Sequence, residues 1–150
     1  MKTLLVIYHS QSGNTAALAN AVICGAKKEP IELRVKTAFE ADLQDLLAAD
    51  GLLIGSPENL GYMAGAIKDF IDRTFYPAQP YALNIPYGLF ISAGNDGSGA
   101  VRELDRALLG YPMKKAVEPV IVRGLIRDAD LELCATLGEA MAAGLIMGAL

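Results

Sequence analysis

The chain has 150 residues, 53% of them hydrophobic, and a formal net charge of −4 at pH 7. This length suits one domain with a sizeable buried core, and the acidic balance excludes a nucleic-acid-binding surface and a polybasic membrane contact. The first ten residues combine one lysine with a short apolar run, so we expect neither a signal peptide nor a membrane span there.

Strand-like and helix-like segments then alternate along the chain. Apolar runs predict strands at 3–8, 31–36, 51–55, 87–92 and 117–122, and helical periodicity predicts helices near 15–27, 40–48, 64–75, 98–109 and 129–147. Strands separated by helices of this length form crossovers in a parallel sheet. We therefore expect one α/β domain over residues 1–150, a three-layer sandwich in which helices cover both faces of a five-stranded parallel sheet.

The composition of the strands predicts their order. The first, third and fourth are continuous apolar runs, as expected of strands covered on both faces. The second, IELRVK, alternates with charged residues, and the fifth contains Pro119, which cannot donate to a ladder; both features are typical of sheet edges. Right-handed crossovers then give the order 2-1-3-4-5, and ligands of such sheets bind at the carboxyl ends of the strands, where the winding direction reverses.

The loop after the first strand, Ser10 to Thr15, is rich in short hydroxyl and amide side chains at the start of a helix. Gly13 allows successive backbone N–H groups to converge, and the helix dipole adds positive potential, which together suit a phosphate. The loop has no lysine and a single glycine, so it matches neither the Walker loop nor the G-x-G-x-x-G pattern. We interpret it as a site that holds a phosphate; an ordinary polar helix cap is the alternative.

Two motifs carry a family resemblance over nearly the whole chain. SQSGNT, Ser10 to Thr15, resembles the FMN-phosphate loop of the flavodoxin-like flavoproteins, and Ala48 to Arg73 resembles the second flavin loop and following helix of their reductase branch, the NAD(P)H-dependent FMN reductases and quinone-reductase-like flavoproteins. SAGNDGSG, Ser92 to Gly99, matches the third loop in position and in its small residues. The resemblance implies a flavodoxin-like fold with FMN as cofactor.

The resemblance also implies which residues contact FMN. The phosphate contacts would be the side chains of Ser10, Ser12, Asn14 and Thr15, with backbone help from Gln11 and Gly13. The residues along the isoalloxazine ring would be Pro57, Glu58, Asn59, Leu60, Gly61 and Tyr62. The residues at the other edge of the ring would be Ala93, Gly94, Asn95, Asp96 and Gly97. Glu58 would accept from flavin N3–H or remain a solvated loop carboxylate, and Tyr62 would border the ring or pack elsewhere.

Two functions are compatible with such a site. The chain has no tryptophan and no aromatic residue in the third loop, so one face of the ring would lack an aromatic cover. An open face suits a reductase, in which NADH or NADPH reduces the flavin and electrons pass to a quinone or similar small acceptor. The alternative is a flavodoxin-type electron-transfer carrier that works with a redox partner protein. The flavin carries the chemistry, so we expect no catalytic side chain, and no cluster of ligands suggests a metal.

Several other features allow two interpretations. His9 could lend charge to the phosphate region or simply end the strand, and Lys68 and Asp72 are spaced as an exposed helical ion pair. The segment 74–87, with three prolines and three tyrosines, could be a surface loop or could reach the flavin of a neighbouring subunit. The small residues Ala140, Gly144 and Gly148 could pack against the sheet or against a twin helix, so a homodimer is possible.

The two cysteines, Cys24 and Cys134, fall inside helical patterns, with no CxxC motif and no histidine nearby. We expect two buried free thiols in a reducing compartment, and therefore a cytoplasmic protein.

Overall fold

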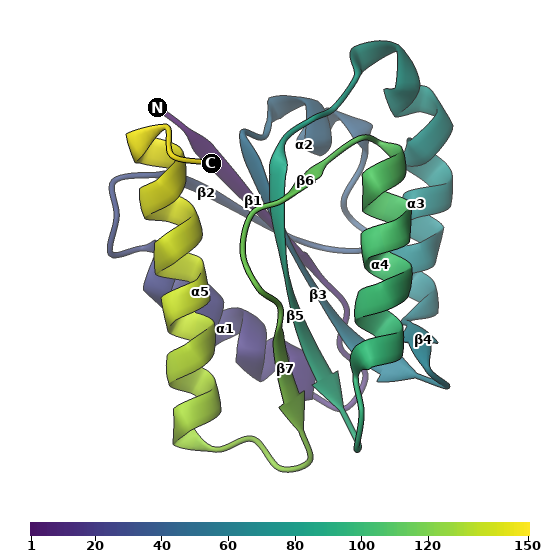
Figure 1. Ribbon diagram of the computed structural model, residues 1–150, viewed down its shortest axis with the longest axis vertical. Helices are drawn as coiled ribbons and strands as arrows, with labels where there is room; N and C mark the ends of the chain where they lie inside the picture. The colour runs from purple at the N-terminus through teal and green to yellow at the C-terminus, as the bar shows by residue number, and fades with distance from the viewer.

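The five predicted strand positions form one parallel sheet, which the computed structural model describes over residues 1–150 (Figure 1). The strands are β1 Thr3–Tyr8, β2 Glu32–Thr37, β3 Gly51–Asn59, β5 Pro86–Ala93, and the short β6 Lys114–Lys115 and β7 Val120–Arg123. β1 lies between β2 and β3, and β5 pairs with β3 on one side and with β6 and β7 on the other, all in parallel. The predicted order 2-1-3-4-5 is confirmed, with β6 and β7 sharing the fifth position.

Helices cover both faces of the sheet (Figure 1). One face carries α1 Asn14–Ala26 and α5 Asp128–Met147, and the other carries α2 Leu43–Ala48, α3 Gly65–Ala78 and α4 Ser98–Gly110. A short strand β4, Tyr62–Met63, pairs antiparallel with the end of β3, and a 3-10 turn, Gln79–Tyr81, follows α3. The apolar side chains of the sheet are thereby divided between two cores, one on each face.

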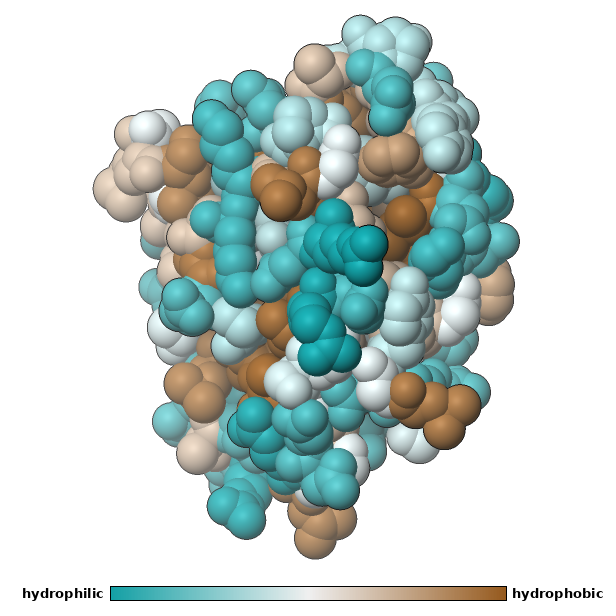
Figure 2. All heavy atoms as spheres, turned by 45° about the vertical axis from the view of Figure 1, so that its right-hand side comes forward, coloured by the Kyte–Doolittle hydropathy of each residue, from teal (hydrophilic) through white to brown (hydrophobic).

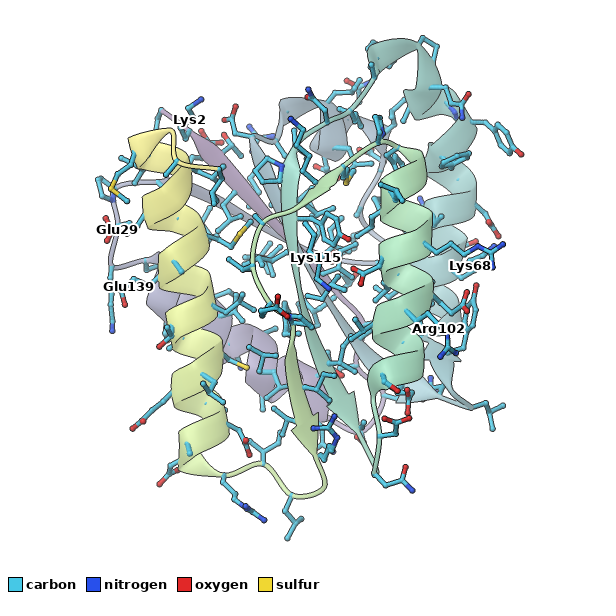
Figure 3. The ribbon with its side chains drawn as sticks, viewed as in Figure 1. Lys2, Glu29, Lys68, Arg102, Lys115 and Glu139 are labelled. Atoms are coloured by element: carbon cyan, nitrogen blue, oxygen red, sulfur yellow. The ribbon has the colours of Figure 1, made fainter.

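The fifth strand is interrupted, so the continuous strand predicted over 117–122 is wrong. Lys115 pairs with Tyr87 in β6, and the ladder resumes only at Val120, opposite Phe90. Pro119 has no N–H to donate, which accounts for the ladder resuming after it. An ion pair holds the first half of this edge, because Lys115 Nζ donates to Asp105 Oδ2 of α4 at 3.0 Å. Lys115 lies between β6 and α4 in Figure 3.

Two helix boundaries differ from the prediction. α2 begins at Leu43, later than the predicted residue 40, because a capping box fixes its start: Asp45 N–H donates to the Asp42 side chain, and Asp42 N–H donates to the Asp45 carboxylate. α3 extends through Pro77 to Ala78, so the first part of the segment 74–87 is helical and the loop interpretation is wrong there. Its possible contact with a second subunit stays a prediction.

The close contact of α1 with α5 depends on glycines other than the three small residues singled out from the sequence. A Cβ on Gly138 would meet the Val22 carbonyl oxygen, and a Cβ on Gly25 would meet that of Ala135. Gly144 is instead covered by the Leu150 side chain at the end of the chain. The helices can therefore approach until their backbones touch, which fixes the position of α1 and of the loop before it.

Both cysteines are free thiols, but only Cys134 is buried; Cys24 is exposed, so the expectation of two buried thiols is wrong for Cys24. None of the helices combines the length and the apolar character needed to cross a membrane. Figure 2 shows the side of the molecule that carries α4, where apolar residues appear as separate small patches among hydrophilic ones.

Candidate functional site

The three predicted loops leave the sheet side by side, because β1, β3 and β5 are neighbours whose carboxyl ends lie at the same edge, at the bottom of Figure 1. They surround an open hollow with a volume of ≈ 390 Å³. Its lining residues are Ser12, Asn14, Pro57, Glu58, Ser92, Ala93, Gly94, Gly124 and Leu125. The structure therefore brings members of all three loops together around one hollow and adds a fourth loop to it.

The first loop presents backbone donors at the start of α1. Gly13 adopts a left-handed conformation with φ 99°, and the N–H groups of Gly13 and Ala16 donate to Ser10 Oγ at 3.2 and 3.1 Å. Five further N–H groups find no acceptor within the protein, those of Ser10, Gln11, Ser12, Asn14 and Thr15. Unpaired N–H groups at a helix amino terminus form an anion-binding site, because they converge and the helix dipole favours negative charge. The first loop therefore presents backbone donors of the kind that bind an anion.

Thr15 has a different environment from its neighbours in the loop. Its side chain is buried, and its hydroxyl shares a hydrogen bond of 2.8 Å with the hydroxyl of Ser92, which is also buried. This bond joins the start of α1 to the end of β5. The Thr15 hydroxyl thus has an internal partner, and no sequence pattern indicated Ser92 as that partner.

The second loop is a β-hairpin, which no sequence pattern predicted. β3 continues past the expected residue 55, and Asn59 pairs with Tyr62 across a two-residue turn. Leu60 and Gly61 form this turn with φ of 53° and 72°, the left-handed values that tight hairpins require. Leu60 is fully exposed at the tip. The base is closed by Ser56 Oγ, which accepts from the Ala64 N–H at 2.9 Å.

Glu58 connects the hairpin to the third loop. Its carboxylate accepts hydrogen bonds from the N–H groups of Gly97 and Gly99 at 2.9 Å and of Ala100 at 3.2 Å. The residue that caps α4 is Gly97, which has no side chain to satisfy these N–H groups. Glu58 is therefore the capping carboxylate of α4, and the interpretation as a purely solvated loop carboxylate is wrong.

Three further hydrogen bonds to side chains hold the loops. Asn59 Nδ2 donates to Gln11 Oε1 at 3.0 Å and so joins the second loop to the first. Asp96 in the third loop accepts from the Ser98 hydroxyl at 2.8 Å and from its N–H at 3.3 Å, and these bonds lower the pKa of Asp96. Asn95 is exposed beside them. The three loops are thus linked to one another before any ligand is considered.

Of the seventeen residues that the resemblance assigns to FMN, six line the hollow, namely Ser12, Asn14, Pro57, Glu58, Ala93 and Gly94. Tyr62 does not, nor does His9, which was also singled out from the sequence. Tyr62 lines a groove of ≈ 590 Å³ between α3 and α4, together with Lys68 and Arg106. His9 packs edge-on against Phe39, with their ring centroids 5.8 Å apart. The predicted ion pair of Lys68 is confirmed, since its Nζ donates to Asp72 Oδ1 at 2.6 Å, and in Figure 3 Lys68 projects outward from α3.

The groove between α3 and α4 and a mostly apolar one of ≈ 520 Å³ beside β7 are larger than the hollow between the loops. Neither is lined by any residue of the first loop, whose unpaired N–H groups are the donors suited to an anion. The smaller hollow at the carboxyl edge is therefore the candidate site. Its fourth wall, Gly124 and Leu125, could have been expected from topology alone, since β7 also ends at this edge.

Residues 3–117 match the protein family described as NADPH-dependent FMN reductase. The chain is 44% identical over 73 residues to a flavodoxin of Aquifex aeolicus, covering 48% of this chain and 40% of the other. It is 33% identical over 99 residues to an NAD(P)H dehydrogenase (quinone) of Archaeoglobus fulgidus, covering 49% of this chain and 52% of the other. Among solved structures it resembles a flavodoxin, WrbA-like protein from Agrobacterium tumefaciens, with a TM-score of 0.82, 20% identity, and 98% and 99% of the two chains covered.

The structural likeness and the strand order together confirm the predicted flavodoxin-like fold. The chain spans about half the length of the two sequence relatives, 52% and 40% respectively for the dehydrogenase and the flavodoxin.

Proposed function

Because the chain belongs to the NADPH-dependent FMN reductase family, whose chemistry uses FMN and a nicotinamide nucleotide, we propose that it is an FMN-binding oxidoreductase. In this proposal NADH or NADPH is the reductant, and a quinone or similar small molecule is the electron acceptor. Bound FMN supplies the chemistry, since its ring takes up a hydride and passes the electrons on.

The observation that carries this proposal is the set of unpaired N–H groups at the start of α1, in a hollow lined by all three loops. They suit the dianionic phosphate of FMN, because they stand at the positive end of the helix dipole and the first loop has no carboxylate to repel the phosphate. Gln11, Ser12 and Asn14 would hold the phosphate with their backbone N–H groups, and Ser12 and Asn14 would add their side chains.

The second and third loops would hold the flavin ring. Pro57 and Ala93 line the hollow and would flank it, while the Glu58 carboxylate fixes the two loops relative to each other. A Cβ placed on Gly94 would meet no heavy atom within 4 Å, so the third loop leaves open space beside it. Open space where a carrier would place an aromatic side chain supports direct access of a nicotinamide, and with it the reductase.

The second candidate is a flavodoxin-type electron carrier, which would share the cofactor site and depend on a redox partner protein. The 44% identity to a flavodoxin over 73 residues favours it. The two candidates differ in one property, because only the reductase should accept electrons directly from a free nicotinamide nucleotide.

Anaerobic reduction distinguishes them. Apoprotein is loaded with FMN, excess flavin is removed, and NADH or NADPH is added while the flavin absorbance is followed. Rapid bleaching, reversed by a benzoquinone through repeated turnovers, is expected for the reductase. Retention of FMN without bleaching by either nucleotide would support the carrier, and failure to retain FMN would contradict both. Chromatography of the heat-released cofactor against FMN and FAD standards identifies the flavin.

A further inference from the structure

A fourth loop, Gly124 and Leu125 between β7 and α5, forms part of the wall of the hollow. The Gly124 N–H donates to the Ala93 carbonyl oxygen at 2.9 Å, which ties this loop to the end of β5. Gly124 has a φ of 73°, a conformation that glycine adopts without the steric cost other residues incur. The turn is therefore anchored to β7, which it follows, and to β5 through this hydrogen bond. Leu125 is the next residue in the chain.

Leu125 is a large apolar side chain that remains 88% exposed. It is the only leucine, isoleucine, valine or methionine among the residues that line the hollow. A leucine side chain gains free energy when it leaves water, so a ligand that covers Leu125 is bound more tightly than one that leaves it exposed. Its exposure on the wall of a binding hollow is therefore a feature that ligand binding can use.

The wall around Leu125 offers no other bulky side chain. A Cβ on Gly94 or on Gly124 would meet no heavy atom within 4 Å, so both glycines border open space. Ser92 is turned inward and is bonded to Thr15. Shielding of a ligand on this side of the hollow thus depends on Leu125.

We propose that Leu125 packs against bound FMN and excludes water from that side of the hollow. This inference rests on the proposed function, since it takes FMN as the ligand. Hydrogen bonds and charge interactions are stronger when water is excluded, so the contact also strengthens the bonds between the first loop and the phosphate. Leu125 is then a cofactor-binding residue that takes no part in the electron transfer itself.

The test is the dissociation constant of FMN, measured by quenching of flavin fluorescence on titration with apoprotein. Leu125→Ala should raise it about tenfold, because most of the apolar contact is lost. Leu125→Met should change it by less than about twofold, because methionine keeps the volume. The matched control is Leu109→Ala, which removes a leucine on α4 that is 67% exposed and lines none of the hollows.

The thermal midpoint of each apoprotein is measured in parallel, and a midpoint equal to that of the wild type shows that the fold is intact. An unchanged FMN affinity in folded Leu125→Ala overturns the role of Leu125 while FMN binding itself stands. An equal loss of FMN affinity in Leu109→Ala also overturns the role of Leu125. If the wild-type protein fails to quench flavin fluorescence, the proposed function and this inference both fall.

Discussion

Glu58 Oε2 accepts a hydrogen bond from the Gly99 N–H at 2.9 Å, across 41 residues of sequence. The same carboxylate satisfies Gly97 and Ala100, so the amino terminus of α4 is capped from the hairpin instead of from its own preceding residue. A carboxylate at this position is favoured both by the hydrogen bonds and by the helix dipole. The second and third loops are therefore held in one arrangement, with or without a ligand.

We expect Glu58→Gln to lower the free energy of unfolding of the apoprotein by about 1–3 kcal/mol. The amide keeps one acceptor oxygen but turns an NH₂ group towards N–H donors, so at least one bond is lost. Urea denaturation of the apoprotein measures the change. The control is Glu118→Gln, which alters an exposed carboxylate that makes no hydrogen bond or ion pair. Equal midpoints for the two variants would show that the Glu58 cap contributes nothing.

Thr15 and Ser92 provide a second test of a link between loops. Their hydroxyls share a buried hydrogen bond of 2.8 Å, so either Thr15→Ala or Ser92→Ala leaves one buried hydroxyl without its partner. Each single change should lower the free energy of unfolding by about 1–3 kcal/mol. The double variant should lose less than the sum, with a coupling of about 1 kcal/mol. If the two single changes in the free energy of unfolding add up exactly in the double variant, the hydrogen bond between the two hydroxyls does not stabilise the protein.

The sequence predicted the parts of this protein that depend on local pattern. Continuous apolar runs identified the central strands, and charged alternation and Pro119 identified the edges. A strand buried on both faces is apolar throughout, whereas a strand with one exposed face alternates between apolar and polar residues. The order of strands then placed the loops that begin at His9, Ser56 and Ala93 at one edge of the sheet. These inferences needed no knowledge of distant contacts.

Two of the missing parts depend on residues far apart in the chain. The bond of Glu58 to Gly99 and that of Thr15 to Ser92 arise from tertiary contacts that no local pattern encodes. The hairpin was missed for a different reason. Its turn contains leucine at a left-handed position, where Asn or Asp before glycine is the usual signal.

Leu60 itself leads to a prediction. A leucine with φ of 53° is strained by about 1 kcal/mol, and its side chain is fully exposed, so nothing in the protein compensates. We expect Leu60→Asn to raise the free energy of unfolding of the apoprotein by about 0.5–1 kcal/mol. It should also weaken FMN binding, if Leu60 contacts the ring as the family resemblance implies.

The matched control is Leu109→Asn, at an exposed helical position with ordinary backbone geometry. There asparagine is the poorer residue, and stability should fall by about 0.5 kcal/mol. Urea denaturation and FMN titration of both variants report the two effects separately. A destabilised Leu60→Asn apoprotein would contradict the assignment of strain to this turn.

The two thiols should differ in reactivity. Burial raises the pKa of the Cys134 thiol to about 11, whereas Cys24 is exposed. A disulfide reagent at pH 8 should therefore modify one thiol in the native protein and two in urea, and Cys24→Ser should abolish the native reaction. Modification of two thiols at comparable rates in the folded protein would show that Cys134 is reached without unfolding.

The same pKa shift gives a pH dependence. The unfolded thiol of Cys134 ionises near pH 9, while the native thiol keeps its proton to about pH 11. The native state therefore binds more protons between these values, and the free energy of unfolding falls as the pH rises through this window. The stabilisation of the native state that comes from its preference for the neutral Cys134 thiol is fully present below pH 9. Denaturation series at pH 8, 9.5 and 11 should show this decline.

Gly99 allows the sharpest test of the contact between the hairpin and α4. In the first turn of a helix, Gly→Ala ordinarily stabilises by about 0.5–1 kcal/mol. Here we expect the opposite sign, because a Cβ on Gly99 would overlap the Gly61 carbonyl oxygen and lie 3.1 Å from Glu58 Oε2. The hairpin tip would have to move away from α4, which should lower the free energy of unfolding by about 1–3 kcal/mol and weaken FMN binding.

Gly65→Ala is the matched control for this substitution. Gly65 is the first residue of α3, and a Cβ there would meet no heavy atom within 4 Å, so stability should be unchanged or slightly raised. Both variants replace glycine by alanine in the first turn of a helix, but only Gly99 lies close to the hairpin. Urea denaturation and FMN titration are carried out on both. A stabilised Gly99→Ala protein with full FMN affinity would mean that the hairpin tip shifts freely along α4, and that Glu58 does not fix the second loop against the third.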